Sequence, residues 1–217
     1  MSTEYTGGTR PGWMRVVVIT GTLLAVLLLG ASVGLLVSPS ESSEPAPGTV
    51  DIGFAQDMSV HHRQAALMAS LVAERSTDPA IQPLAFDIEF AQLEQIGRMQ
   101  GWLSLWDAPP LPAGNRMTWM SGHGHGHGGV ETMPGMASPQ QLEELRHASG
   151  REFDILFLQL MLRHHQGGVP MARYAQQHAE VPQVRNLAGQ MLTAQTMESD
   201  YMKQLLAERG AEPLPVP

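Results

Sequence analysis

DIGFAQDMSVHHRQAALMA, residues 51–69, and DILFLQLMLRHHQGGVPMA, residues 154–172, are two versions of one pattern. The alignment extends without a gap over residues 51–112 and 154–215, at a constant offset of 103 positions. Both copies keep an Asp, a Phe, a Gln, a Met, a His-His pair and a Met-Ala pair at equivalent places. A His-His pair beside Met and Asp is a set of potential metal ligands, and its recurrence suggests a two-fold site rather than chance.

Each copy of this repeat predicts a pair of helices. In the first copy we expect helices over about 50–75 and 79–106, separated by a break at Ser76–Pro79, where Asp78 can cap the second helix. In the second copy we expect helices over about 150–178 and 182–209. Since neither hairpin could bury its apolar face alone, the two should pack together as an all-α four-helix bundle made of two duplicated helical hairpins.

One local feature argues against a straight third helix. Gly167-Gly168-Val169-Pro170 follows the second His pair directly, and a proline inside a helix removes a hydrogen bond. This run predicts a weakened or kinked helix there.

The N-terminal segment from Val16 to Val37 carries no charge over its 22 residues. A helix of that length reaches about 33 Å, enough to cross the roughly 30 Å core of a bilayer. Arg10 and Arg15 precede it, and a basic flank stays in the cytoplasm. We therefore expect a single-pass anchor in the cell membrane, with the remaining chain extracytoplasmic. A cleaved signal peptide is the competing interpretation, although its apolar region is usually only about 7–15 residues long.

These features divide the chain into seven segments. They are a cytoplasmic N-terminus (1–15), a transmembrane anchor (16–37), a Ser/Pro/Glu linker (38–49), a first helical hairpin (50–110), a Gly/Met/His-rich crossover (111–138), a short helix with the second hairpin (139–210), and a Pro-rich tail (211–217). The short helix is expected to begin at Pro139, capped by Ser138. The crossover shows no helical period and is expected to be irregular.

The amino-acid composition narrows the classes of ligand that the chain could bind. A net charge of −8 argues against nucleic-acid binding, which needs a basic face. The chain has no cysteine, so any metal would be held by imidazole, thioether, carboxylate or amide groups. It has 14 methionines, most of which we interpret as flexible core filler.

Helical geometry places the conserved side chains of each copy on one face. At 100° per residue, Asp51, Met58 and His62 point the same way, while His61 lies to the side, above Met68. The equivalents in the second copy are Asp154, Met161, His165, His164 and Met171.

The second helix of each hairpin carries its own polar stripe. Gln92, Gln95 and Met99 are spaced i, i+3, i+7. Their equivalents are Gln195, Glu198 and Met202. If the faces meet, the bundle interior holds four His, several Met, two Asp and one Glu.

Two interpretations of this interior remain open. Buried imidazoles are often purely structural, with Gln or Asp accepting their N–H groups across helices. Two His pairs in equivalent frames, each followed by Met, favour metal binding, and thioether donors favour Cu(I) among the metals that suit imidazole.

The crossover supplies a second set of candidate ligands. His123, His125 and His127 alternate with glycine, on a chain flexible enough to wrap one ion. His-rich tracts are a known metal-binding composition. The competing interpretation is a polar low-complexity loop without a fixed role.

An enzyme is less well supported. Di-iron bundles need about four carboxylates and two Glu-x-x-His motifs, whereas this chain has one such motif, Glu144 to His147, outside the repeats. No Ser-His-Asp or phosphate-loop pattern occurs.

At these residues the chain resembles the bacterial domain of unknown function 305 family. The resemblance rests on Met133-Pro134-Gly135-Met136, Ala148-Ser149-Gly150, Phe153 to Leu158, Met161, His164-His165, Gly167 and Met171-Ala172, and on the first copy from Asp51 to Trp102. It implies a ferritin-like four-helix bundle, exported or membrane-anchored, and some members are linked to periplasmic copper binding. The chain departs from the family pattern at two places. Gln95 stands where the family usually has Glu, and the run Gly168–Pro170 stands where the family usually has an uninterrupted helix.

The sequence therefore predicts a membrane-anchored, extracytoplasmic protein that binds copper, or another divalent transition metal, for sequestration or tolerance. An envelope scaffold with structural His pairs is the main alternative, and a redox enzyme a weaker one. The partners expected are a metal ion and the membrane, without nucleic acid. The predicted metal ligands are Met58, His61, His62, Met68, Met161, His164, His165, Met171, Glu198, His123, His125 and His127.

Overall fold

The structure is a computed structural model that describes residues 12–37, 45–120 and 132–215. It divides into two compact units, residues 1–44 and 45–217. The first unit contains one helix, α1 (Gly12–Val37). Its stretch from Gly12 to Gly34 has a mean hydropathy of 2.5 and is long enough to cross a membrane. This helix fits either a signal peptide or an anchor.

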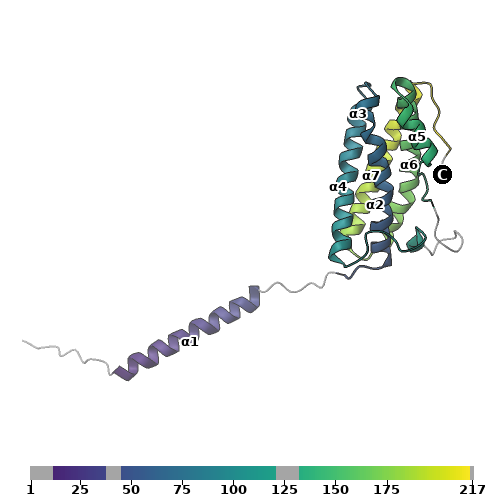
Figure 1. Ribbon diagram of the computed structural model, residues 1–217. Coiled ribbons are helices and arrows are strands. Elements are labelled where there is room, and N and C mark those ends of the chain that lie inside the picture. The colour runs from purple at the N-terminus through teal and green to yellow at the C-terminus, as the bar shows by residue number, and fades with distance from the viewer. Residues whose placement is uncertain (1–11, 38–44, 121–131, 216–217) are drawn as a thin grey trace, which may run out of the picture. The chain divides into compact units, whose positions relative to one another are not determined.

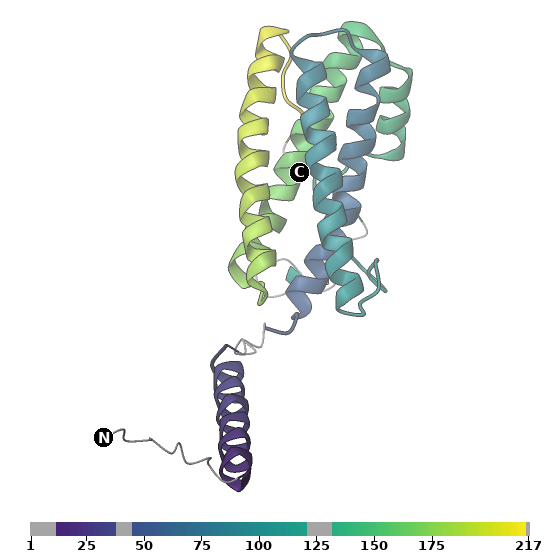
Figure 2. The same ribbon diagram turned by 90° about the vertical axis from the view of Figure 1, so that its left-hand side faces the viewer.

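The second unit is built from four long helices that lie side by side in both views (Figures 1 and 2). They are α2 (Thr49–Ser70), α4 (Ile81–Leu105), α6 (Gly150–His178) and α7 (Pro182–Glu208). The shorter elements are α3 (Val72–Arg75), the 3-10 turn η1 (Thr118–Met120) and α5 (Pro139–His147). Every regular element in the described part of the chain is a helix, so the predicted all-α four-helix fold is confirmed.

The helix ends follow the local sequence signals closely. Asp78 accepts hydrogen bonds from the N–H groups of Ala80 and Ile81 at 2.9 and 3.3 Å. Helix α4 begins at Ile81, two residues after the expected start at Pro79. Ser138 accepts from the N–H of Gln141 at 3.2 Å at the start of α5. The expected weak point in the third helix does not end it, because α6 continues through Pro170 to His178.

Equivalent residues of the two hairpins make equivalent contacts. The Gln56 amide donates to the Pro109 carbonyl at 2.7 Å, and its equivalent Gln159 donates to the Glu212 carbonyl at 2.6 Å. In each case the acceptor belongs to the segment that follows the hairpin's second helix. The chain leaves these helices through positive φ angles at equivalent residues, Asp107 (52°) and Gly210 (61°).

The core consists of two apolar clusters with a polar layer between them. One cluster takes residues from the second half of α2 and the first half of α6, and the other takes the first half of α2 and the second half of α6. The two helices therefore run antiparallel. Each methionine of one cluster has its repeat equivalent in the other cluster. Met68, Met161 and Met202 lie in the first cluster, and their equivalents Met171, Met58 and Met99 lie in the second.

The crossover is attached to the bundle on both sides of residues 121–131, which lie outside the described residues. On one side the Asp57 carboxylate accepts from the N–H of Met117 at 2.6 Å and from the indole N–H of Trp119 at 2.9 Å. On the other side the Gln64 amide exchanges two hydrogen bonds with the backbone of Ala137, at 2.9 and 2.7 Å. The described parts of the crossover are thus ordered against α2, although they are irregular as expected.

Candidate metal centre

All four histidines of the two pairs lie in the polar layer and are fully buried. His61 from α2 and His164 from α6 face each other, with ring centroids 3.7 Å apart and ring planes tilted by 33°. The second histidine of each pair lies farther off, at 6.5 Å from His61 to His62 and 6.2 Å from His164 to His165. The predicted meeting of the two His-His frames is therefore present in the structure.

The outer histidine of each pair bonds to the second helix of its own hairpin. The ring Nε2 of His62 lies 2.7 Å from Oε1 of Gln95 on α4. The ring Nε2 of His165 lies 2.6 Å from Oε2 of Glu198 on α7. Gln95 and Glu198 are equivalent positions, so the same contact is made by a neutral amide in one hairpin and by a carboxylate in the other.

The inner histidines bond to backbone carbonyls. The Nε2 of His61 lies 3.1 Å from the Pro134 carbonyl oxygen in the crossover. The Nε2 of His164 lies 3.0 Å from the carbonyl oxygen of His61. The crossover therefore takes part in the layer and makes its two halves unequal.

These four contacts determine the tautomer of every ring. A carbonyl, carboxylate or amide oxygen can only accept, so each Nε2 must carry the proton and donate it. Each Nδ1 then holds a free lone pair. All four Nδ1 atoms are buried and have no hydrogen-bond partner in the structure. Buried polar atoms are rarely left unpaired, and a histidine whose other nitrogen is tied to an oxygen acceptor is the usual form of a metal ligand.

Burial also keeps three of these histidines, His61, His62 and His164, uncharged. Burial lowers the pKa of His61 to about 4 and that of His62 to about 3. Burial, followed by the repulsion of the other three rings, holds the pKa of His164 well below its usual 6.5. Neutral imidazole is the form that binds metal, and these three rings are in that form at neutral pH.

Two glutamines complete the interior of the layer. Gln92 and Gln195 are equivalent, each 3% exposed, and each has an Oε1 without a hydrogen-bond partner. Gly168 packs against Gln195 and His61: a Cβ there would come within 2.6 Å of Oε1 of Gln195 and 3.3 Å of Cε1 of His61. The first copy has Ala65 at this place. The departure of the Gly168 run from the repeat therefore has a packing reason.

Thioether donors lie next to the layer on the same helices. Met58 and Met161 precede the His pairs by one turn, and Met68 and Met171 follow them by two turns; all four are fully buried. No group of three or more His, Asp or Glu side chains in the described residues is arranged to hold a metal. The candidate donors of this region are therefore imidazole and thioether groups that are not yet gathered around one point, and this donor chemistry fits a soft ion such as Cu(I) better than a hard one.

Other predicted residues lie elsewhere. The Asp51 carboxylate is at one end of the bundle, accepting from the N–H groups of Gly48, Glu180 and Val181 at 2.9 to 3.0 Å. His147, from the single Glu-x-x-His motif, pairs with Glu143 on the exposed helix α5. His123, His125 and His127 are outside the described residues.

Sequence reasoning missed the segment that covers the layer. We call residues 133–137 the strap. Gly135 of the strap has a φ of +79°, and a Cβ there would lie 3.0 Å from the Cα of His164. A Cβ on Gly167 of α6 would overlap the Pro134 carbonyl group. The two glycines let the strap lie directly on α6, and they were visible in the sequence only as part of a family pattern.

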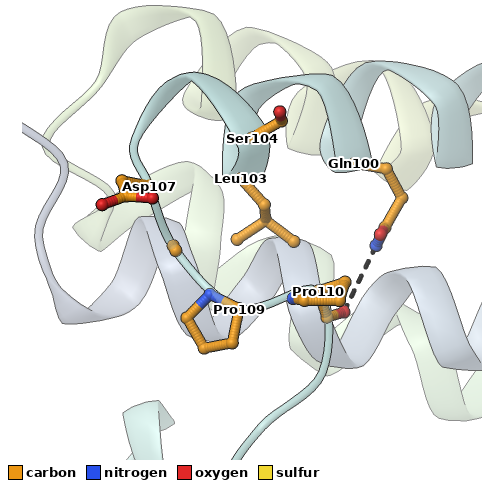
Figure 3. A pocket seen from close by; sticks show the side chains of 7 residues that line it. Gln100, Leu103, Ser104, Asp107, Pro109 and Pro110 are labelled. Carbon is orange, nitrogen blue, oxygen red and sulfur yellow. Dashed lines mark hydrogen bonds between the residues drawn. The ribbon is translucent and has the colours of Figure 1, made fainter.

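A surface pocket lies at the end of α4, and its lining includes no residue of the histidine layer. That pocket is lined by Gln100, Leu103, Ser104, Asp107 and Ala108 to Pro110, none of which is a predicted ligand (Figure 3). Gln100 closes one side of it by donating to the Pro110 carbonyl at 3.4 Å. The candidate site is the closed layer itself.

Residues 51–206 match the sequence profile of a family described as domain of unknown function, DUF305. This chain belongs to the DUF305 family. The matched residues include both hairpins and the strap. No curated protein matches the chain.

Solved structures of DUF305 proteins share this fold. One, from Streptomyces coelicolor and inferred to be secreted, is 40% identical, with a TM-score of 0.70 and coverage of 76% of this chain and 97% of the other. A DUF305 fragment from Deinococcus radiodurans is 30% identical, with a TM-score of 0.63 and coverage of 76% and 99%.

A third similar protein has been seen with metal. CopM in its Cu(I)-bound form is 26% identical, with a TM-score of 0.57 and coverage of 73% of this chain and 96% of CopM. A Cu(II)-bound form of CopM, at 29% identity and a TM-score of 0.56, and an Ag-bound form also match. The bundle of this DUF305 protein is thus similar to one that binds copper and silver.

Proposed function

We propose that this DUF305 protein is an extracytoplasmic copper-binding protein that sequesters copper or confers tolerance to it, held at the membrane by α1. The observation that carries the proposal is the set of four buried Nδ1 atoms without partners, on His61, His62, His164 and His165. Their neighbouring Nε2–H groups are all tied to oxygen acceptors. Imidazoles held in this way are positioned ligands.

The choice of copper follows from the donor chemistry and from the similar proteins. The layer offers imidazole nitrogens flanked by fully buried methionines, and the chain has no cysteine to favour zinc. CopM, a similar protein, has Cu(I)-bound and Cu(II)-bound forms. Copper bound here would be shielded from solvent, which suits storage better than turnover.

The alternative function as an envelope scaffold predicts a different state of the histidine ring nitrogens. If the His pairs served only to hold the helices together, each ring should have both nitrogens satisfied. One nitrogen of each is satisfied and the other is not. That half-satisfied state favours the metal-binding function.

A titration of the full chain in detergent with Cu(I) tests the proposal. We expect binding tighter than micromolar and a rise in thermal stability, because a ligand at about 100 times its Kd stabilises the folded state by about 2.7 kcal/mol. Replacing His61, His62, His164 and His165 by Ala should abolish both effects. Replacing the exposed His147 by Ala removes an imidazole outside the layer and should change neither.

A deletion of residues 122–128 separates the two candidate sites. We expect the deleted chain to keep high-affinity binding with fewer equivalents bound. Copper binding that disappears with the deletion, or that survives in the quadruple Ala variant, would place the site in the Gly-His tract instead. No binding by the intact chain would leave the scaffold interpretation.

A further inference from the structure

The two halves of the histidine layer differ in charge at one matched position. His62 donates from Nε2 to the neutral amide of Gln95 at 2.7 Å, and His165 donates from Nε2 to the carboxylate of Glu198 at 2.6 Å. Gln95 and Glu198 have nearly the same size and shape, occupy equivalent positions, and hold their histidines by the same nitrogen. The difference between the halves at this point is therefore one negative charge.

That charge lies against a ring whose other nitrogen is free. His165 is fully buried and its Nδ1 has no partner. A carboxylate that accepts the Nε2 proton makes the imidazole more basic, and the effect passes through the ring to Nδ1. A neutral amide oxygen fixes the same tautomer without adding charge. His165 should thus be the stronger donor of the two.

The position of Glu198 preserves its effect. Its side chain is 24% exposed, so it is largely shielded from water, and in the described residues it accepts a hydrogen bond from His165 and forms no ion pair with a lysine or arginine. The attraction between a carboxylate and a cation grows in proportion to the charge of the cation. Glu198 therefore favours a divalent ion over a monovalent ion at His165.

Resting on the proposed function, we propose that Glu198 and Gln95 give the layer two unequal half-sites. The His165 half, backed by Glu198, prefers a divalent ion such as Cu(II), and the His62 half, backed by Gln95, suits a monovalent ion such as Cu(I). Glu198 is then a residue that sets specificity through His165 and need not touch the metal. This differs from its predicted role as a direct ligand.

Isosteric exchange of the two residues tests the proposal in both directions. The full chain in detergent is titrated with Cu(II) and, separately, with Ag(I), a monovalent probe that does not change oxidation state. Glu198→Gln should weaken Cu(II) binding by about ten- to a hundredfold, the usual effect of losing such a supporting residue, and change Ag(I) binding by less than about threefold. Gln95→Glu should strengthen Cu(II) binding by about tenfold.

Glu208→Gln is the matched control. It removes the same charge from the same helix, ten residues and about 15 Å farther on, where Glu208 is exposed and bonds to Gln204. It should leave both affinities unchanged. Melting curves without metal check that each variant folds, and Gln95→Glu keeps the test valid if Glu198→Gln does not fold.

The outcomes separate this inference from the proposed function. If wild-type protein binds neither ion, the proposed function fails. If it binds both, but Glu198→Gln weakens Ag(I) as much as Cu(II), or a folded Gln95→Glu leaves Cu(II) binding unchanged, the two-half-site inference is overturned while copper binding stands.

Discussion

At the residue scale, the molecule buries four imidazoles in a layer that satisfies only half of their polar atoms. Hydrogen bonds from Nε2 hold each ring in place, and burial removes the charge of His61, His62 and His164. An unpaired buried nitrogen costs free energy in the metal-free protein, typically about 1–3 kcal/mol. A bound cation would remove that cost, so the metal-free fold should be less stable than its size suggests.

The lowered pKa values predict that metal-free protein loses stability in acid. In the unfolded chain His61 and His62 titrate near 6.5, whereas in the folded protein their pKa values are about 4 and about 3. Between these limits the unfolded state binds more protons, so stability is complete above pH 6.5 and falls as pH drops. Each histidine contributes about 1.4 kcal/mol per pH unit in this window.

Urea unfolding of metal-free protein at pH 7.5, 6.5, 5.5 and 4.5 measures this slope. The other buried rings and Glu198 face the same layer, so a comparison variant is needed to isolate one histidine. His62→Gln should reduce the slope below pH 6.5 by about 1.4 kcal/mol per pH unit. An equal slope in the variant and the wild type would show that His62 is not held neutral by burial.

Helical periodicity could predict some of these pairings and not others. The i, i+3 stripe on each second helix placed Gln95 and Glu198 toward the His pairs correctly, because direction around a helix follows from spacing. The same reasoning grouped Asp51 with His62. Asp51 in fact bonds to backbone N–H groups at the end of the bundle, since two turns separate it from Met58. Periodicity gives direction but no partner.

At the element scale, the strap is the part of the site that sequence patterns could not supply. Its contribution to His61 is the backbone carbonyl of Pro134, and a carbonyl group is common to every residue. The contact depends on a glycine on each side of the junction. Gly135 supplies the positive φ and Gly167 the close approach.

Gly167→Ala should detach the strap from α6. The new Cβ would overlap the Pro134 carbonyl, a backbone group that cannot rotate away, so the strap must shift and the His61 hydrogen bond should be lost. We expect a loss of about 1–3 kcal/mol in the free energy of unfolding, the usual cost of overpacking. Urea denaturation measures this loss, and faster chemical modification of His61 would report the opened layer.

Gly101→Ala on α4 is the same substitution at an open position, and we expect it to raise the free energy of unfolding. A Cβ there would meet nothing within 4 Å, so only helix propensity changes, and we expect a gain of about 0.5–1 kcal/mol. If both variants lose stability alike, the loss at Gly167 does not come from contact with the strap.

At the scale of the whole molecule, the two hairpins of the bundle are nearly symmetric and differ at a few residues near its centre. The hairpins share their core methionines and their glutamine contacts. They differ where Glu198 replaces Gln95 and where Gly168 replaces Ala65. The repeat in the sequence predicted the shared frame, whereas the effect of each difference depends on side chains from other helices and could be seen only in the folded structure.

The N-terminal helix α1 is the feature of the chain that fits a signal peptide or a membrane anchor. The segment from Gly12 to Gly34 can cross a membrane, and both an anchor and a signal peptide pass that test. We predict an anchor, because the 22 uncharged residues from Val16 to Val37 exceed the apolar length of about 7–15 typical of a signal peptide. A chain tagged at its C-terminus and expressed in bacteria should therefore remain full-length in carbonate-washed membranes. Leu27→Arg, which places a charge at mid-span at a cost of about 2.5–3.5 kcal/mol, should reduce that fraction, whereas a shorter, soluble wild-type product would identify a cleaved signal peptide.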